Sequence, residues 1–325
     1  ITNEDLEGIV HNFDEKLAGK PFCKWVEDVT GVQGRYYVSE EETPETMGAE
    51  ASKKAIESAG IKPDEIEFIV VSTFTSDLIA NPSTTIGHLI GAEKAGKHSN
   101  QSLNTACSGF VYALADTLAY IMAGFYKTIL VVATEALSNY IDFNDPKTAV
   151  LFGDGAGAAV VRVSEDKGIL TMPYLNSIYS DNIVLKNPYF SKFNAKDIIT
   201  PCEREYLERE YIRMPGGPRV LRRAVNEMER ALHEALKIGG YDIKDIDYII
   251  PHPANERITM DYATRFPDNK VCDNIKKYGN TSCSGTAISL DLTFRNKLEE
   301  YKPKPGDKIA ITTVGGSYTS AAAII

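Results

Sequence analysis

The chain contains three pairs of similar segments, and the two members of each pair lie about 160 to 180 residues apart. The most similar pair is Asn-Thr-Ala-Cys-Ser-Gly at 104–109 and Asn-Thr-Ser-Cys-Ser-Gly at 280–285. Chance similarity of common helix–strand units would explain any one pair, but three pairs in one order indicate two similar halves. The other two pairs are the helix-to-strand stretches 45–73 and 232–250 and the glycine-rich stretches 153–160 and 315–322.

Each half alternates helical and strand-like patterns, which is typical of an α/β protein. Residues 45–60 read as an amphipathic helix stopped by a glycine. The nearly continuous apolar run 66–73 then predicts a strand buried on both faces. We expect an N-terminal half at 1–165 and a C-terminal half at 166–325. The irregular stretch 171–213 near their junction is either a functional insertion or a plain surface excursion.

Composition narrows the class of protein. Of 325 residues, 43% are hydrophobic and 25% are charged, as in a globular chain, and the formal net charge of −10 argues against binding of duplex nucleic acid. No apolar run approaches the ~20 residues of a membrane helix. The five cysteines form no CxxC pair, so we expect no zinc site, no disulfide framework and a cytoplasmic location. Because the chain opens on Ile1, we expect that some N-terminal sequence is missing.

Cys107 is the first candidate for catalysis. It follows the short run 102–104 and precedes an apolar helical pattern at 110–123, which places it at a strand-to-helix turn. The N–H groups of a helix start favour a thiolate, the nucleophilic form. The alternative is a buried structural cysteine. Cys283 has nearly the same local sequence, so the pattern alone does not separate the two.

His252 and Asn280 are the other candidates. His252 follows a predicted strand, and sites in α/β proteins usually lie at the carboxyl ends of strands. It is therefore a candidate acid, base or hydrogen-bond donor, with a core histidine as the alternative. Asn280 could supply a carboxamide donor or cap a turn.

The order Cys107, His252, Asn280 in a duplicated α/β chain resembles the thiolase-fold condensing enzymes, most of all the β-ketoacyl-acyl-carrier-protein synthase III family. The resemblance implies a thiolase fold, with two pseudo-duplicated halves in a layered α-β-α-β-α core. It also implies a homodimer and an opening strand that would lie before Ile1. The segments that carry it are 104–114, 152–160, 251–258 and 278–282, together with Trp25 and 30–32.

The same resemblance assigns roles. Cys107 becomes the acylated nucleophile and Cys283 a packing residue. An acyl group from acyl-CoA or acyl carrier protein is loaded on Cys107 and then condensed with malonyl carrier protein after loss of CO₂. His252 and Asn280 hold the enolate oxygen, and the backbone N–H groups of Cys107 and Gly316 form the oxyanion hole. The substrates are thioesters of CoA or phosphopantetheine, and neither a metal nor another cofactor is implied.

Three positions are assigned to substrate binding by the resemblance: Trp25, Asn81 and Asn255. Trp25 matches a tryptophan that stacks on the adenine of CoA, but Val29 and Pro146 stand where two arginines flank that base. Asn81 replaces a bulky aromatic residue that reaches across the dimer to end the acyl pocket. We therefore expect a roomier or more polar pocket.

Four arginines with no acidic residue between them, Arg213, Arg219, Arg222 and Arg223, form a candidate docking surface for an acidic acyl carrier protein. An ordinary solvated helix start is the alternative, because glutamates on either side nearly balance them.

The function predicted is thus a ketosynthase of fatty-acid or polyketide biosynthesis. The alternatives are a ketosynthase or cyclase of specialised metabolism that uses acyl carrier substrates, and an acyltransferase on the same scaffold. A non-catalytic partner that only binds acyl carriers is the third. The intact Cys107, His252 and Asn280 argue against that last alternative.

Overall fold

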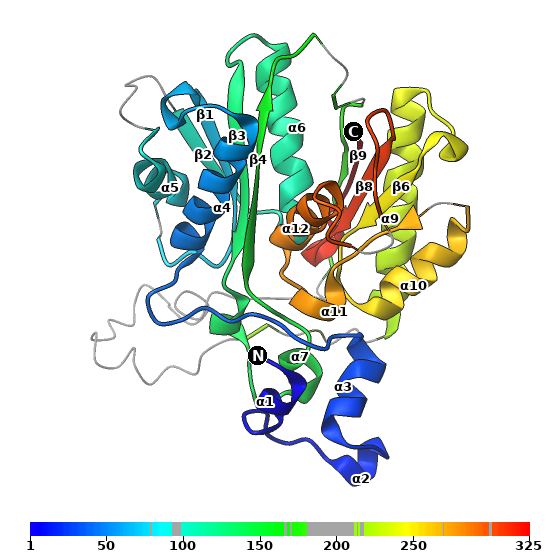
Figure 1. The fold of residues 1–325 in the computed structure, drawn as a ribbon. Helices are drawn as coiled ribbons and strands as arrows, with labels where there is room; N and C mark the ends of the chain where they lie inside the picture. The colour runs from blue at the N-terminus through cyan, green and yellow to red at the C-terminus, as the bar shows by residue number, and fades with distance from the viewer. Residues whose placement is uncertain are drawn as a thin grey trace, which may run out of the picture.

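Two mixed β-sheets with helices between and around them form the molecule in the computed structural model (Figure 1). The structure describes residues 1–78, 80–92, 99–165, 168–169, 171–180, 211–212, 214, 218–268, 270–298 and 301–325. The first sheet has the order β2-β1-β3-β4, from β1 (Phe68–Ser72), β2 (Ser99–Leu103), β3 (Thr128–Glu135) and β4 (Gly155–Arg162). The second has the order β5-β9-β8-β6-β7, from β5 (Tyr174–Asn176), β6 (Tyr248–Pro251), β7 (Lys270–Val271), β8 (Ile309–Val314) and β9 (Ser320–Ile324).

The pairing of the strands confirms the duplication. In the first sheet β1 pairs in parallel with β2 and β3, and β4 runs antiparallel to β3. In the second sheet β6 pairs in parallel with β7 and β8, and β9 runs antiparallel to β8. Only β5, antiparallel to β9, has no counterpart among the described residues of the first half. The expectation of a strand before Ile1 stays a prediction.

The helices complete five layers, α-β-α-β-α, as predicted (Figure 1). The central layer holds α6 (Gly109–Met122) and α12 (Cys283–Phe294), which contact both sheets. The outer face of the first sheet is covered by α4 (Pro44–Ala59) and α5 (Pro82–Ile90). The outer face of the second is covered by α9 (Pro218–Gly239) and α10 (Glu256–Arg265).

Local sequence explains where the predicted elements begin and end. Thr43 and Thr46 form a capping box at the start of α4, and Gly60 ends that helix in the left-handed conformation. All five residues of β1 are buried, as its continuous apolar pattern predicts. The equivalent helix α9 extends well before the predicted stretch 232–240. None of the described helices is both long and apolar enough to cross a membrane.

Short helices gather at one end of the layers (bottom of Figure 1). They are α1 (Asn3–Glu7), α2 (Glu15–Ala18), α3 (Phe22–Thr30) and α7 (Pro146–Ala149), and α11 (Ile275–Tyr278) lies above them. Leu6, Phe22, Val26 and Val150 form the centre of their core. The remaining short helices are η1 (Pro63–Glu65), η3 (Ala106–Ser108), η4 (Leu137–Tyr140), η5 (Ile243–Asp245) and η6 (Gly316–Tyr318).

Candidate active site

Both repeated cysteine segments form the same tight turn at a helix start. Cys107 lies in η3, between β2 and α6, and Cys283 is the first residue of α12. The residue before each cysteine, Ala106 (φ 49°) and Ser282 (φ 53°), has a left-handed backbone, which is uncommon for residues other than glycine. A Cβ at Gly109 would lie 1.7 Å from Ser72 Oγ, so only glycine allows α6 to start here.

The structure distinguishes the two thiols that the sequence leaves equivalent. Cys107 is half-buried, whereas Cys283 has no exposed surface. The Cys283 thiol faces the Glu135 carboxylate, with 3.3 Å between Sγ and Oε1, and Sγ also lies 3.4 Å from the Ser72 carbonyl oxygen. Of these two cysteines, only Cys107 can be reached by a substrate.

His252 and Asn280 lie on loops that are joined to each other. His252 directly follows β6, is buried, and donates its backbone N–H to the Thr312 carbonyl at 2.7 Å. The Asn280 Nδ2 donates to the Ala254 carbonyl at 3.3 Å, two residues beyond His252.

Ser282 links the three predicted catalytic residues. Its backbone N–H donates to Asn280 Oδ1 at 2.9 Å, and its hydroxyl lies beside the Cys107 thiol, where it lowers the pKa of that thiol. Asn280 also holds the loop of His252, so the turn at 280–282 contacts that loop through Asn280 and adjoins the Cys107 thiol through Ser282. The Asn280 amide is thereby oriented, because its oxygen is occupied by Ser282 and one N–H by Ala254.

Burial fixes the charge state of His252. It lowers the pKa of the imidazole to about 3, so the ring is neutral over the whole physiological range. Its Nδ1 has no hydrogen-bond partner in the described part of the chain. The tautomer with the proton on Nε2 leaves only a lone pair unpaired there, and it provides one N–H donor.

The Cys107 thiol is protonated at rest, which differs from the expectation of a thiolate. Burial raises its pKa to about 11, and the charge of Glu135 contributes to the rise, while the Ser282 hydrogen bond acts in the opposite direction. The dehydrated surroundings of the sulfur outweigh the favourable helix start. The proton must therefore leave when the sulfur attacks.

The glycine turn between β8 and β9 packs on the Cys107 turn. Ser108 Oγ donates to the Thr319 carbonyl at 2.7 Å, and Thr319 Oγ1 donates to the Thr105 carbonyl at 3.1 Å. A Cβ at Gly315 would lie 2.9 Å from the Cys107 backbone nitrogen, so this close approach requires glycine. The Gly315 N–H is occupied, since it donates to the Thr319 carbonyl at 2.7 Å, and the assignment of the Gly316 amide to the oxyanion hole stays a prediction.

Sequence reasoning missed Glu135, the last residue of β3. It has no exposed surface, and burial raises the pKa of its carboxyl to about 7. A polar residue at the end of the apolar run 128–135 could have been found by the same rule that selected His252. The hydrogen-bond donors to its carboxylate are Thr73, Phe74, Thr75, Ser282 and Cys283.

Trp25 lies on α3 and is half-buried. Its ring packs against Phe13 and Phe22, with centroids 5.0 and 6.2 Å away. Trp25 is thus partly buried against the core of the short helices. Pro146 begins α7 and supplies no charge to this region.

Asn255 joins the helices at this end. Its Oδ1 accepts from the Arg257 backbone N–H at 2.9 Å and caps α10, while its Nδ2 donates to the Val29 carbonyl at 3.0 Å. The side chain thus connects α10 to the end of the helix that carries Trp25.

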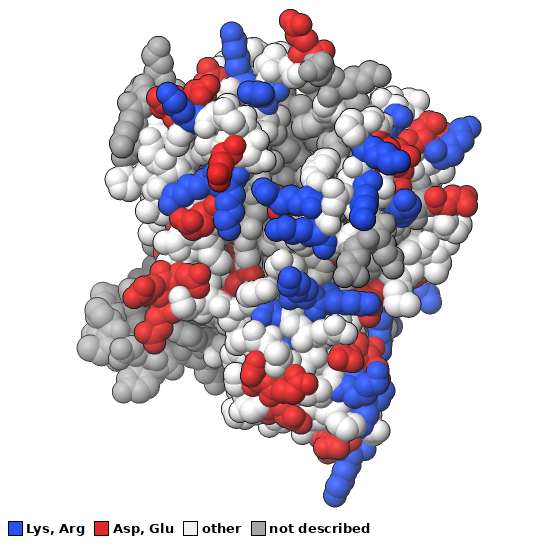
Figure 2. Space-filling view, in the orientation of Figure 1, with Lys and Arg blue, Asp and Glu red and all other residues white. Residues whose placement is uncertain are grey.

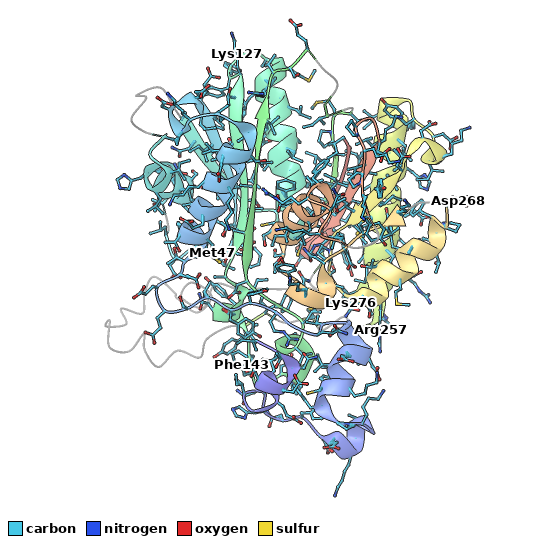
Figure 3. All side chains as sticks on the ribbon, viewed as in Figure 1. Met47, Lys127, Phe143, Arg257, Asp268 and Lys276 are labelled. Atoms are coloured by element: carbon cyan, nitrogen blue, oxygen red, sulfur yellow. The ribbon has the colours of Figure 1, made fainter. Side chains whose placement is uncertain are left out.

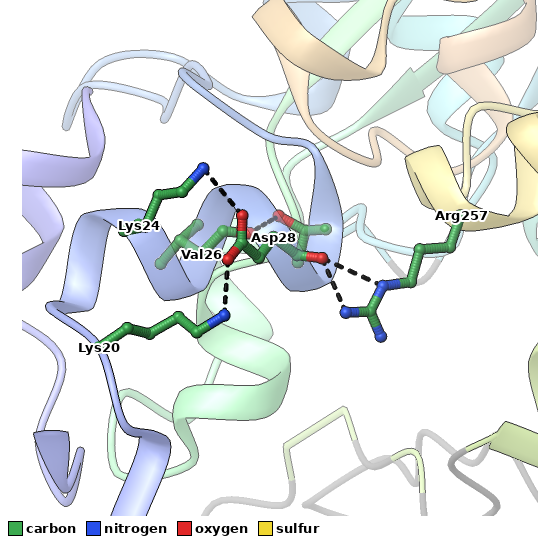
Figure 4. A network of polar contacts seen from close by, with 6 residues as sticks. Lys20, Lys24, Val26, Asp28 and Arg257 are labelled. Atoms are coloured by element: carbon green, nitrogen blue, oxygen red, sulfur yellow. Dashed lines mark hydrogen bonds and ion pairs between the residues drawn. The ribbon is translucent and has the colours of Figure 1, made fainter. Parts of the chain in front are cut away.

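A charged network surrounds the C-terminal turn of α3 (Figure 4). The Asp28 carboxylate accepts from Lys20 at 2.6 Å and from Lys24 at 2.9 Å, and the Asp28 carbonyl accepts two hydrogen bonds from Arg257. Arg257 and Lys276 approach this turn from α10 and α11 (Figure 3). Basic side chains continue along the outer edge of α2 and α3 (Figure 2). Trp25 therefore has cations nearby, although Asp28 holds two of them.

Asn81 lies beside β2, the outermost strand of the first sheet among the described residues. It is exposed and precedes α5 with φ 44°. Its Nδ2 donates to Asn100 Oδ1 at 2.6 Å, and its Oδ1 accepts from Ser102 Oγ at 3.2 Å. Both partners belong to β2.

The described arginines of the candidate docking surface lie in the first turns of α9. Arg219 and Arg222 are exposed, and the Arg223 guanidinium lies 4.4 Å from the centroid of the Tyr318 ring. Because Tyr318 belongs to η6, this surface adjoins the glycine turn of the site. Arg213 lies outside the described residues. Within the described ranges no group of three His, Cys, Asp or Glu residues could hold a metal ion.

Comparison with known proteins agrees with this geometry. The family model for 3-oxoacyl-[acyl-carrier-protein (ACP)] synthase III matches residues 102–176, and the model for the C-terminal part of that enzyme matches 236–325. The β-ketoacyl-[acyl-carrier-protein] synthase III of Clostridium novyi is 34% identical over 336 residues, which cover 100% of this chain and 94% of that protein. The chain belongs to the β-ketoacyl-[acyl-carrier-protein] synthase III family. It is a condensing enzyme and an acyltransferase.

Solved structures of synthase III enzymes have the same fold. The enzyme from Aquifex aeolicus VF5 is 32% identical, with a TM-score of 0.83 over 100% of this chain and 94% of that one. The priming β-ketosynthase of the R1128 polyketide pathway is 29% identical, with a TM-score of 0.85 over 100% of this chain and 91% of that one. The thiolase fold predicted from the sequence is thus confirmed.

Proposed function

We propose that this synthase III loads an acyl group on Cys107 and condenses it with malonyl carrier protein to give a β-ketoacyl thioester. The observation that carries the proposal is the placement of Ser282, which adjoins the reachable thiol of Cys107, donates to Asn280 and, through Asn280, is tied to the loop of His252.

Loading begins when the Cys107 sulfur attacks the carbonyl carbon of the acyl thioester. A new S–C bond forms, the bond to the donor sulfur breaks, and the donor leaves as a thiolate. The N–H groups of Cys107 and Gly316 stabilise the negative oxygen of the tetrahedral intermediate. The close approach of Gly315 to the Cys107 amide supports this pairing.

Condensation uses His252 and Asn280. When the malonyl group loses CO₂, the negative charge moves onto the thioester oxygen, and His252 Nε2–H and the second Asn280 N–H donate to that oxygen. A neutral imidazole suits this role, since its proton stays on the donor. The enolate carbon then attacks the acyl-Cys107 carbonyl and expels the Cys107 thiolate.

We further propose that an acyl carrier protein delivers the acyl group. Arg219, Arg222 and Arg223 form a basic surface beside the glycine turn, and a carrier protein is acidic. A nucleotide would meet Trp25 without a cation at Val29 or Pro146, and its phosphates would compete with Asp28 for Lys20 and Lys24. Asn255 supports the Trp25 helix and serves substrate binding in this way.

Homodimerisation through the edge of the first sheet belongs to the same proposal. Strand β2 pairs only with β1 among the described residues, and its other edge is available to a second copy. Asn81 lies beside this edge, where it would face the partner subunit and leave the acyl pocket open and polar.

A role in specialised metabolism is the second candidate. The departures at Val29, Pro146 and Asn81 favour it, and one similar structure is a priming ketosynthase of a polyketide pathway. An acyltransferase without condensation, or a carrier-binding partner, would leave the enolate donors His252 and Asn280 without use.

The experiment separates the two half-reactions. In His252→Ala and Asn280→Ala, we expect acylation of Cys107 by intact mass to persist, because both side chains are assigned to the enolate oxygen, which forms only after the malonyl group has lost CO₂. Release of CO₂ from malonyl carrier protein should fall by ~10²–10³, the usual cost of one lost oxyanion donor. His233→Ala, on the exposed face of α9, is the control. Decarboxylation at the parent rate in either variant would contradict its assigned role.

A further inference from the structure

The buried carboxylate of Glu135 has no role in the proposed reaction, yet it accepts a hydrogen bond from Ser282, a neighbour of the catalytic residues. Ser282 Oγ, which lies beside the Cys107 thiol and lowers its pKa, donates to Glu135 Oε1 at 3.3 Å. Ser282 therefore stands between the reactive sulfur and a carboxylate, hydrogen-bonded to the carboxylate and next to the sulfur.

The two oxygens of Glu135 have different surroundings. Oε2 accepts from Thr75 Oγ1 at 2.7 Å and from Thr73 Oγ1 and the Phe74 N–H at 3.2 Å each, which holds the carboxylate in place. Oε1 faces only Ser282 and Cys283, at the active-site side. In the described part of the chain, no Lys, Arg or His pairs with this carboxylate.

A buried carboxylate without a cation is costly to keep charged, and burial accordingly raises the Glu135 pKa to about 7. The titratable groups that face it are the thiols of Cys107 and Cys283. At neutral pH the carboxylate is thus close to the point where it accepts a proton, while the Cys107 thiol has one to lose. Among the described residues, the Ser282 hydroxyl is the group that both touches Glu135 and acts on the Cys107 thiol.

We propose that Glu135 is a positioning residue that receives, through Ser282, the proton that Cys107 loses on acylation, and returns it when condensation frees the thiolate. The inference rests on the proposed role of Cys107 as the acylated thiol.

The protons balance over the cycle. In loading, the S–C bond forms as the thiol proton moves to Ser282 Oγ and the Ser282 proton moves to Glu135 Oε1. The donor thiolate takes a proton from water as it leaves. In condensation, the C–C bond forms, the S–C bond to Cys107 breaks, and the Glu135 proton returns through Ser282 to the sulfur. The net reaction consumes one proton, together with the loss of CO₂ from malonate.

The test is single-turnover acylation of Cys107, followed by intact mass from pH 5.5 to 9, in the parent and in Glu135→Gln. A proton acceptor contributes ~10²–10⁴-fold, and with a serine between we expect Glu135→Gln to acylate at least ~10-fold more slowly near pH 7. The deficit should be small at pH 5.5, where Glu135 is already protonated and accepts no proton, and it should shrink again toward pH 9, because hydroxide replaces the carboxylate as the base.

If Glu135 acted only through its negative charge, Glu135→Gln would change the acylation rate in the opposite direction. The Glu135 charge raises the pKa of Cys107, so its removal alone would ease thiolate formation and speed acylation. Acylation of Glu135→Gln at the parent rate or faster would therefore overturn the proposal.

Three further variants keep the test decisive. Glu135→Asp should recover part of the rate, and Ser282→Ala should reproduce the defect while Glu135 keeps its other donors. Cys283→Ala, which removes the other Oε1 donor, should acylate normally. If Ser282→Ala acylates normally, no proton passes from Cys107 through Ser282 to Glu135, and the proposal is wrong. If the parent is not acylated at Cys107 at all, the proposed function fails instead, which intact mass of Cys107→Ser separates from failure of the relay.

Discussion

At the residue scale, burial shifts the pKa of His252 and of Glu135 in opposite directions. It lowers the pKa of the imidazole and raises that of the carboxyl, because it disfavours the charged form of each. Both residues are therefore driven toward neutrality, and the site approaches catalysis with little fixed charge. A neutral donor and a carboxylate close to its titration point are what an enolate and a transferable proton require.

The raised pKa of Glu135 predicts a pH dependence of stability. The folded protein binds a proton at Glu135 more tightly than the unfolded chain, so this contribution is complete below pH 4.5 and lost as pH rises to about 7. Relative to the parent, Glu135→Gln should thus gain about 2–3 kcal/mol in free energy of unfolding between pH 5 and pH 8. Urea unfolding of both proteins at pH 5 and pH 8 measures this gain. The titration of His252 affects both proteins equally and cancels when their free energies of unfolding are subtracted. An equal difference at both pH values would contradict the raised pKa.

The site residues that could be predicted from the sequence are those that stand in a recognisable local pattern. Cys107 and Asn280 stand in repeated strings, and His252 follows an apolar strand. The difference between Cys107 and Cys283 could not be predicted from local sequence, because it depends on which thiol packs against Glu135. Ser282 was missed for the same reason, since its contact with Glu135 joins residues 147 positions apart. Glu135 could have been noticed at the end of its apolar run, but not its contact with Ser282.

At the element scale, the glycine turn at 315–316 predicts that alanine at position 315 and alanine at position 316 affect activity very differently. Gly315→Ala would place a Cβ 2.9 Å from the Cys107 nitrogen, so the turn must move and the oxyanion hole is disrupted. We expect kcat/KM for condensation to fall by ~10² or more.

Gly316→Ala is the matched control for that change. The nearest atom to its added Cβ is 3.6 Å away, on Ala106, and its N–H is retained. It should keep most of the activity. Equal loss in the two variants would show that the turn tolerates no side chain anywhere and would remove support for the specific contact with Cys107.

The elements themselves were largely predictable. The strand predicted at 66–73 is observed as Phe68–Ser72, and the helix predicted at 110–123 is observed as Gly109–Met122. Helix α9 begins 14 residues before Leu232, and these residues were not predicted as part of the helix. Its first turns are rich in arginine, and their apolar side chains pack against β8 and β9. The short strands β5 and β7 carry too few residues for a pattern.

At the scale of the whole molecule, the basic surface at the start of α9 predicts which molecule donates the acyl group. We expect an acyl carrier protein to load Cys107 at least tenfold more efficiently than the matching acyl-CoA, and added salt should weaken that preference. Arg219→Glu/Arg222→Glu should reduce it, because both side chains are exposed beside the site. The measurement is kcat/KM for acylation with each donor.

The control for that prediction is Arg295→Glu/Lys297→Glu, the same change of charge at the end of α12. It should leave the preference intact. Equal loading by both donors, or a preference for CoA, would contradict carrier delivery and assign nucleotide binding to Lys20, Lys24 and Arg257 around Trp25.

The duplicated architecture was predictable because three repeated segments mark equivalent strands and helices of both halves. Their junction was not, since the irregular stretch 171–213 has no repeated counterpart. We keep the division at 165 and 166 as a proposal.

The central claim is that Cys107, not Cys283, carries the acyl group. Intact-mass measurement after incubation with acyl carrier protein thioesters tests it most directly. The parent and Cys283→Ala should each gain the mass of one acyl group, because Cys283 is enclosed between Glu135 and Ser72. Cys107→Ser should gain none. An acyl adduct that survives in Cys107→Ser and disappears in Cys283→Ala would contradict the account.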